Sequence, residues 1–173
     1  MIATRLTDTS FKRSLASLPV GSTVDIEGPY GDLLLHHDAA RPAVFLAGGI
    51  GITPFRSMIL DATERGLFHR LFLFYGNRRA EDAAFLSELS ELEKQNPRFK
   101  LIATCTEPDG APADWRGERG YITREVISKY VGDIAAPVYY VAGPPAMVSA
   151  METLLEEARV KAKDVKAETF LGY

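Results

Sequence analysis

The chain has 173 residues, of which 46% are hydrophobic and 25% are charged, and its formal net charge is −3. These values fit one globular domain, or one domain and part of a second, and the lack of a long basic run argues against nucleic acid or anionic membranes as partners. A single cysteine excludes an internal disulfide framework. Residues 1–15 lack the apolar core of a signal peptide, and no apolar run has the length of a membrane span, so we expect a cytoplasmic protein.

The first 40 residues are expected to be mainly short β elements, with one short helix over 10–18. Strands and turns are predicted over 2–6, 19–21, 23–27, 28–31 and 33–35. We interpret them as the last antiparallel strands of an incomplete barrel, because they are too few to close one. A domain boundary is expected within 38–42.

Residues 41–173 alternate between buried strands and helices, which predicts an α/β fold with a parallel sheet flanked by helices on both faces. Strands are predicted over 43–47, 71–75, 100–106, 138–142 and 165–170. Helices are predicted to begin at Pro54 and to lie over 82–95, 123–130 and 144–158, with a long loop over 106–120.

The first parallel strand runs into three glycines and a helix start. Gly48, Gly49 and Gly51 permit a sharp turn and the close approach of a ligand. Thr53 is expected to be the N-cap and Pro54 the first helical residue. Such a helix start suits an anion such as a pyrophosphate. The spacing departs from the common Gly-x-Gly-x-x-Gly fingerprint, so a tight turn that binds nothing is the alternative.

Two further strand ends are notable, because ligands of such sheets bind at the carboxyl ends of the strands. Gly143 and Pro144 end the fourth predicted strand and prepare a second helix start at the same edge. The second strand ends in Asn77, Arg78 and Arg79. Arginine without an acidic residue favours the 2′-phosphate of NADP, and we prefer Arg78 as its ligand. The alternative is a pair of solvated surface arginines.

The remaining candidates for chemistry are weak. Cys105 is interpreted as a small buried hydrophobe. His36, His37 and His69 lack ligand spacing and are expected at the surface. We predict no metal site and no certain catalytic residue, because neither a nucleophile–histidine arrangement nor a carboxylate pair stands out. Chemistry carried by cofactors fits that pattern.

Several segments in this order resemble the ferredoxin–NADP reductase superfamily of flavin-dependent NAD(P)H oxidoreductases. They are GGIGITP at 48–54, YGNR at 75–78, GPPAM at 143–147 and ETFLGY at 168–173. The segment WRGERGYI at 115–122 is similar to a loop of the bacterial flavin-reductase branch. The similarity runs over nearly the whole chain.

The resemblance implies an NAD(P)-binding α/β domain over 41–173 and the end of an FAD-binding barrel over 1–40. Members of the superfamily pass hydride from NAD(P)H to FAD and electrons to a carrier such as ferredoxin or flavodoxin. The implied contacts to NADP, or to NAD, come from Gly48, Gly49, Gly51, Ile52, Thr53, Pro54, Asn77, Arg78, Arg79, Gly143, Pro144 and Met147.

For FAD, the resemblance implies a contact from Ser10 to the pyrophosphate and stacking of Phe170 or Tyr173 on the flavin ring. Two departures weaken this part. The Arg-x-Tyr-Ser/Thr motif that clamps the flavin is absent from the sequence, and Ala142 replaces a cysteine often found near the nicotinamide. We therefore expect the chain alone to retain FAD weakly or not at all.

Three hypotheses follow for the role of the chain. The first is the NAD(P)H-binding part of a flavin reductase, either as a fragment of it or completed by a flavin-domain chain, which passes electrons to a carrier protein. The second is a non-catalytic module that binds or senses NAD(P). The third is a reductase completed by a homodimer, because unpaired β edges over 1–37 favour association.

Overall fold

The computed structural model describes residues 3–28, 30–31, 33–107 and 115–170. The strands are β1 (Ala43–Gly48), β2 (Leu71–Asn77), β3 (Phe99–Cys105), β4 (Glu118–Arg119), β5 (Val138–Gly143) and β6 (Val165–Thr169). The helices are α1 (Ser10–Ser17), α2 (Ile52–Glu64), α3 (Leu86–Gln95), α4 (Arg124–Val131) and α5 (Pro145–Glu157). Short 3₁₀ turns are η1 (Gly49–Gly51), η2 (Ala80–Asp82) and η4 (Ala162–Asp164).

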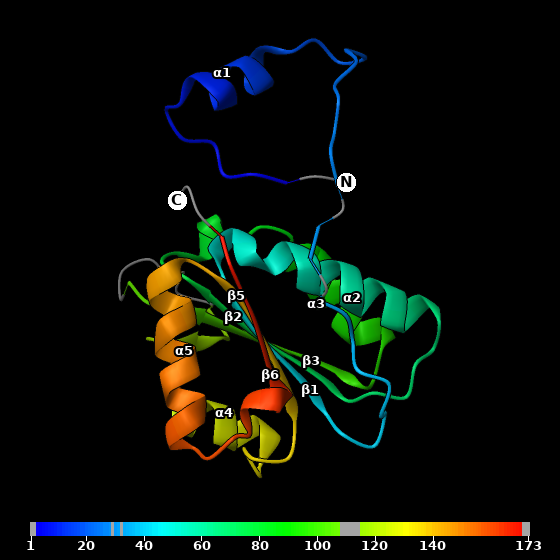
Figure 1. Ribbon diagram of the computed structural model, residues 1–173, viewed down its shortest axis with the longest axis vertical. Coiled ribbons are helices and arrows are strands. Elements are labelled where there is room, and N and C mark those ends of the chain that lie inside the picture. Colours follow the sequence, from blue (N-terminus) through cyan, green and yellow to red (C-terminus); the bar gives the residue numbers. More distant parts are fainter. Residues whose placement is uncertain (1–2, 29, 32, 108–114, 171–173) are drawn as a thin grey trace.

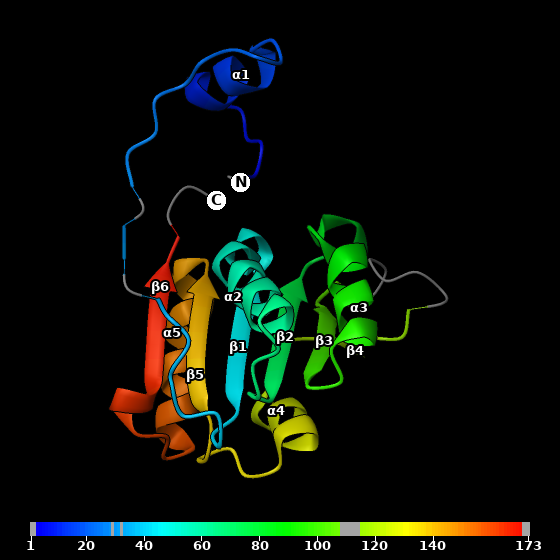
Figure 2. The ribbon, with the colours of Figure 1, turned by 90° about the vertical axis from the view of Figure 1, so that its right-hand side faces the viewer.

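The strands form one parallel sheet in the order β4-β3-β2-β1-β5-β6, which confirms the predicted α/β class (Figure 2). The chain builds outward from β1 to β4 and then returns to place β5 on the other side of β1. The direction of winding therefore reverses between β1 and β5. In sheets of this kind a ligand binds where the carboxyl ends of two such strands separate.

Helices cover both faces of the sheet: α2 and α3 lie on one face, α4 and α5 on the other (Figures 1 and 2). Every residue of β1 and β5 is buried. On the first face Phe45 of β1 packs against Phe55 of α2 and Tyr140 of β5, with ring centroids 5.1 and 5.2 Å apart. The unbroken apolar runs of these strands follow from this burial on both sides.

Two helices begin at other residues than predicted. A 3₁₀ turn over Gly49–Gly51 leads into α2, so the helix starts at Ile52. Thr53 is already helical and is not the N-cap; its hydroxyl donates to the carbonyl of Ile50 at 3.1 Å. Similarly, α3 begins at Leu86 rather than at 82, because Phe85 has a left-handed backbone with φ of 61° that interrupts the helix.

The three strands predicted before residue 36 do not form among the described residues, and α1 confirms only the short helix of this region. A strand needs a hydrogen-bonded neighbour, and the described part of the structure offers these segments none. The part of the chain with α1 rises beyond the carboxyl edge of the sheet (Figures 1 and 2). The domain division at residue 40 stays a prediction.

The long loop predicted over 106–120 is interrupted by β4, a two-residue strand that pairs with Thr104 and Cys105 of β3. Residues 108–114 lie outside the described part. The predictions for 123–130 and 144–158 are confirmed by α4 and α5, and those for 71–75, 138–142 and 165–170 by strands whose ends agree within two residues. Cys105 is buried, with 2% of its surface exposed, as expected.

The linker before β1 packs along the α2 face of the sheet. Leu33 and Leu35 contact the core there. The backbone N–H of His36 donates to the hydroxyl of Tyr140 at 2.7 Å, and the carbonyl of His36 lies 2.8 Å from Nε2 of His69. His69 is 5% exposed and His36 is half-buried, so the expectation that both lie at the surface was wrong. Burial also lowers the pKa of His36.

Arg41 fixes the end of the linker at the amino edge of the sheet. Its guanidinium donates to the carboxylate of Asp164 at 2.7 Å and to the carbonyls of Ala136 and Pro137 at 3.0 and 2.9 Å. Three loops from distant parts of the sequence are thus joined by one side chain. Arg41 in turn lowers the pKa of Asp164.

Replacing Asp164 by asparagine is expected to lower the free energy of unfolding at pH 7 by about 1.5–3 kcal/mol, the range for a hydrogen bond to a charged group. The folded-state pKa of Asp164 is below its unfolded value, so its contribution is present above the unfolded pKa and is lost as pH falls through the folded pKa. Urea unfolding at pH 7 and below about pH 3 measures the difference.

The control is Asp61→Asn, because Asp61 forms an exposed pair with Arg65. Exposed pairs contribute little, so this variant should lose less than about 0.5 kcal/mol. A loss in the Asp164 variant that does not shrink in acid would contradict the role assigned to the ion pair.

Candidate functional site

The two glycine turns meet at the point where the winding of the sheet reverses. A Cβ atom on Gly51 would overlap the carbonyl oxygen of Ala142 at the end of β5. One on Gly48 would overlap the sulfur of Met147, and one on Gly143 would lie 3.1 Å from the Cα of Gly48. Gly143 also has a φ of 158°. The missing side chains therefore let the turns pack against each other. The sequence had indicated only that these glycines permit a sharp turn and the approach of a ligand.

Two helices begin at this edge with their amino ends toward it. The N-cap residues of α2 and α5 are Gly51 and Pro144, neither of which has a side chain that accepts a hydrogen bond. No side chain therefore caps either start, and the N–H groups of Ile52 and Met147 donate to backbone carbonyls instead. The helix dipoles at these two starts attract an anion. Gly49 and Ile50, half-buried in the turn before α2, lie beside them.

The end of β2 supplies two arginines in different electrostatic situations. Arg79 donates to the carboxylate of Glu107 at 2.9 Å and lies 3.4 Å from that of Glu81. Arg78 is exposed and forms no ion pair with any residue that the structure describes. Its backbone is held instead, since its carbonyl accepts from the N–H of Glu107 at 3.0 Å. Asn77 is buried, with 7% exposure.

The other predicted ligands differ in how closely they approach the edge. Thr53 and Pro54 are half-buried at the start of α2. Ile52 is fully buried in the core, and its N–H bonds to the carbonyls of Gly49 and Ile50. Its side chain therefore packs in the core beneath the glycine turn and does not line the carboxyl edge of the sheet.

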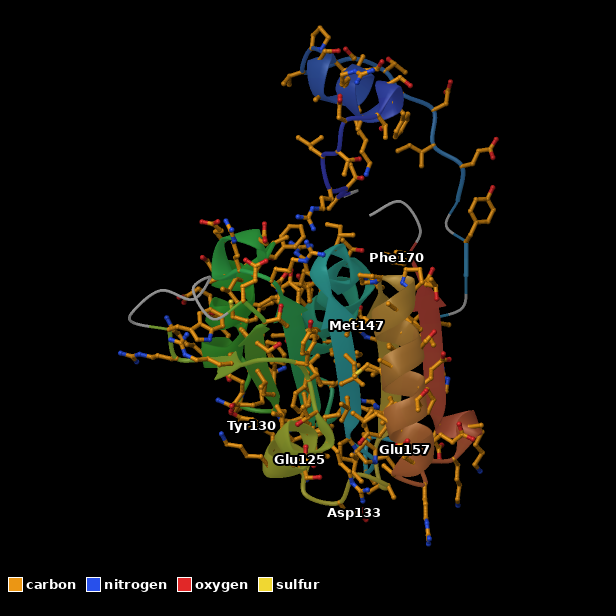
Figure 3. The ribbon with its side chains drawn as sticks, turned by 90° about the vertical axis from the view of Figure 1, so that its left-hand side faces the viewer. Glu125, Tyr130, Asp133, Met147, Glu157 and Phe170 are labelled. Carbon is orange, nitrogen blue, oxygen red and sulfur yellow. The ribbon has the colours of Figure 1, made fainter. Side chains whose placement is uncertain are left out.

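Of the residues predicted to contact FAD, Phe170 is at this edge: its N–H donates to the carbonyl of Gly143 at 3.0 Å. Figure 3 shows Phe170 and Met147 at the same end of the sheet. Ser10 lies on α1, which stands apart from the sheet in Figures 1 and 2, so the structure does not bring it to the glycine turns. Tyr173 is outside the described residues.

The arrangement suits a long, flat, polyanionic ligand such as a nicotinamide dinucleotide. Uncapped helix starts lie in the middle of the edge, an exposed arginine lies at the end of the neighbouring strand, and a half-buried aromatic ring follows β6. In general, helix starts favour phosphate groups, and an arginine at this position of such a sheet favours a ribose phosphate. Within the described residues, no group of His, Cys, Asp and Glu side chains is arranged to hold a metal ion.

Sequence reasoning missed two features of the sheet, a long-range hydrogen bond and a buried hydroxyl group. The bond from His36 to Tyr140 joins residues 104 positions apart, and periodicity reports only neighbours within an element. The hydroxyl of Thr104, 1% exposed, has no hydrogen-bond partner among the described residues and faces Gly76 at the end of β2. No local pattern around Thr104 distinguishes it from an ordinary strand residue.

In comparison with known proteins, the family model of the oxidoreductase NAD-binding domain matches residues 45–153. The chain is 31% identical over 153 residues to the reductase component DmpP of phenol 2-monooxygenase from Pseudomonas sp. (strain CF600), covering 88% of this chain and 43% of that protein. It is 29% identical over 160 residues to reductase component 2 of terephthalate 1,2-dioxygenase from Comamonas sp., covering 92% and 47%. The chain thus spans less than half the length of these relatives.

Solved structures agree with this fold. The Amycolatopsis cytochrome P450 reductase GcoB superposes with a TM-score of 0.71 at 26% identity, covering 83% of this chain and 42% of that one. A flavohemoglobin from Malassezia yamatoensis superposes with a TM-score of 0.82 at 22% identity, covering 97% and 42%. The second likeness concerns the fold alone. No helix in the described part of this chain has the length and apolarity to cross a bilayer.

Gly51→Ala is expected to lower the free energy of unfolding by about 1–3 kcal/mol, the usual cost of overpacking, because its Cβ would overlap backbone that cannot move aside. The matched control is Gly76→Ala at the end of β2, where the nearest atom is 3.4 Å away. Thermal unfolding compares the two. Equal destabilisation of both variants would show that the close approach of the turns is not the constraint.

Proposed function

The chain belongs to the oxidoreductase NAD-binding domain family, and on this premise we propose that it is the NAD(P)H-binding part of a flavin-dependent oxidoreductase. The observation that supports the proposal best is the meeting of two glycine turns and two uncapped helix starts at one edge of the sheet. That edge is where parallel sheets of this topology hold dinucleotides. The two relatives described above are, by their names, the reductase components of oxygenases.

We assign each part of the nucleotide to a part of this edge. The start of α2, with Gly49 and Thr53, would hold the pyrophosphate. The segment from Gly143 to Met147 would line the nicotinamide pocket, and Arg78 would contact the phosphate of the adenosine. The nicotinamide supplies a hydride and a flavin accepts it, so the contribution of this chain is to orient the ring and to exclude water around it.

A flavin-binding segment or chain would complete the enzyme, and a one-electron carrier protein or an oxygenase would accept the electrons. The exposed apolar side chains of the N-terminal part, such as Phe11 at 70% and Ile26 at 66%, suit such a covering partner. We place the protein in the cytoplasm. A non-catalytic NAD(P) sensor has no specific structural observation in its favour.

Titration of the purified chain with NADPH, NADH and FAD, each followed by calorimetry, tests the proposal. We expect binding of at least one nicotinamide nucleotide and weaker binding of FAD alone. If a flavin domain is then supplied, NAD(P)H should be oxidised with ferricyanide as acceptor. Nucleotide binding without oxidation in the completed protein would favour the sensor, and the absence of nucleotide binding would refute the proposal as a whole.

Arg78→Ala is expected to weaken NADPH binding by roughly tenfold or more while sparing NADH, because a charged hydrogen bond to the 2′-phosphate contributes about 1.5–3 kcal/mol. Arg79→Ala is the matched control, since Arg79 is already engaged by Glu107 and Glu81. It should change neither affinity more than about twofold. Equal losses of NADPH and NADH affinity in the Arg78 variant would contradict the assignment to the 2′-phosphate.

A further inference from the structure

A second hollow lies at the opposite, amino edge of the sheet. It has a volume of about 480 Å³. Its lining includes Arg70, Phe72, Arg98, Lys100, Lys129 and Tyr130, and we call it the arginine pocket. Figure 3 shows Tyr130 on α4 near the lower end of the sheet, away from Met147 and Phe170. The pocket therefore belongs to a different surface from the nucleotide edge.

The topology explains why the hollow exists. On the face covered by α4 and α5, the side chains of Phe72 and Ile102 belong to one core cluster with Ile127 of α4. The helix α4 has only eight residues, and Lys100, the second residue of β3, is exposed. The strands β2 and β3 pair Phe72 with Lys100, so the Phe72 ring, 8% exposed beneath the guanidinium of Arg70, lies beside a row of cations.

The two arginines are held by aromatic rings and not by carboxylates. The guanidinium of Arg70 lies over the ring of Phe72, 5.3 Å from its centroid, and that of Arg98 lies over Phe68 at 4.9 Å. Neither arginine forms an ion pair with a residue in the described part of the chain. A cation–π contact fixes the plane of a guanidinium and leaves its N–H donors available.

The two lysines of the pocket are already paired. Lys100 lies 2.8 Å from a carboxylate oxygen of Glu93, and Lys129 lies 2.6 Å from one of Glu118. The hydroxyl of Tyr130 also donates to Glu118, at 2.5 Å. Four cations thus face two carboxylates, so the pocket keeps an excess of two positive charges, carried by the arginines.

The arginines also precede neighbouring strands at the same level of the sheet. Arg70 comes directly before Leu71 and Arg98 directly before Phe99, and these two residues are register partners. Adjacent strands are about 4.8 Å apart, so two like charges start close together. An anion between them would relieve that repulsion, and guanidinium groups match carboxylate and phosphate oxygens in pairs.

From this combination we propose that the arginine pocket binds a small anion that carries a flat apolar ring. The ring would lie over the guanidinium of Arg70, which itself covers Phe72, beside Tyr130. The anionic group would accept from the edge of that guanidinium and from Arg98. An aromatic carboxylate and a nucleoside monophosphate both have this chemistry. The volume is within the range of small-molecule sites. The site is separate from the nucleotide edge and does not depend on the proposed function.

The test is a titration of the ¹⁵N-labelled chain followed by amide chemical shifts. The probes are 2-naphthoate, its uncharged analogue 2-naphthamide, and AMP. We expect 2-naphthoate to shift the amides of Phe72, Lys100 and Tyr130, and 2-naphthamide to bind at least tenfold more weakly. Arg70→Gln combined with Arg98→Gln should weaken 2-naphthoate at least tenfold and leave the spectrum elsewhere unchanged.

The matched control combines Arg65→Gln with Arg124→Gln, which removes the same charge from exposed positions outside the pocket. Its affinity should stay within twofold of the parent chain. Whichever of AMP and 2-naphthoate binds the pocket more tightly identifies the source of the ligand. The proposal would be overturned by any of three results: no amide shifts in the pocket at millimolar probe, equal binding of 2-naphthamide and 2-naphthoate, or an equal loss of affinity in the control variant. The first two results are obtained with the parent chain and do not require a variant to fold.

Discussion

The structure depends on how closely the turn after β1 approaches the end of β5. Gly51 lies against the carbonyl of Ala142 with no room for a Cβ, and Gly48 and Gly143 lie against each other. A single methyl group at Gly51 would separate β1 from β5 at the point where the winding of the chain reverses. Because α2 and α5 start immediately after these turns, the same contact sets the distance between the two helix starts. Packing of the fold and shape of the site are thus one constraint.

Charge is distributed around this scaffold by what each arginine already contacts. Arg41 and Arg79 are engaged by carboxylates and hold loops together. Arg78 is exposed, and Arg70 and Arg98 rest on aromatic rings. A guanidinium that is neutralised by a neighbouring carboxylate gains little from a further anion, whereas one that only stacks keeps its donors for a ligand. The type of partner, rather than the presence of arginine, therefore separates structural from binding positions.

The sequence predicted most of the sheet because its strands are continuous apolar runs such as Val44, Phe45 and Leu46, which leave no other way to bury both faces. It also predicted the glycine turns, because the glycines that permit them are adjacent in the sequence. It could not place the start of α3, because the left-handed backbone of Phe85 is set by packing against Arg56 and the core. It also could not show that His69 is buried under the linker, since that contact joins distant residues.

The predicted strands that failed to form show the limit of pattern reasoning most clearly. Thr23 to Glu27 alternates as a strand should, yet Val24 and Ile26 are 52% and 66% exposed. Burying such a side chain contributes about 1.5–3 kcal/mol, and ordering each residue costs about 1–2 kcal/mol of backbone entropy. Alternation alone therefore stabilises nothing until a neighbouring strand supplies both the ladder and the apolar face. The α/β part contains all such neighbours itself, which is why its core residues are almost fully buried while the apolar side chains of the N-terminal part still face solvent.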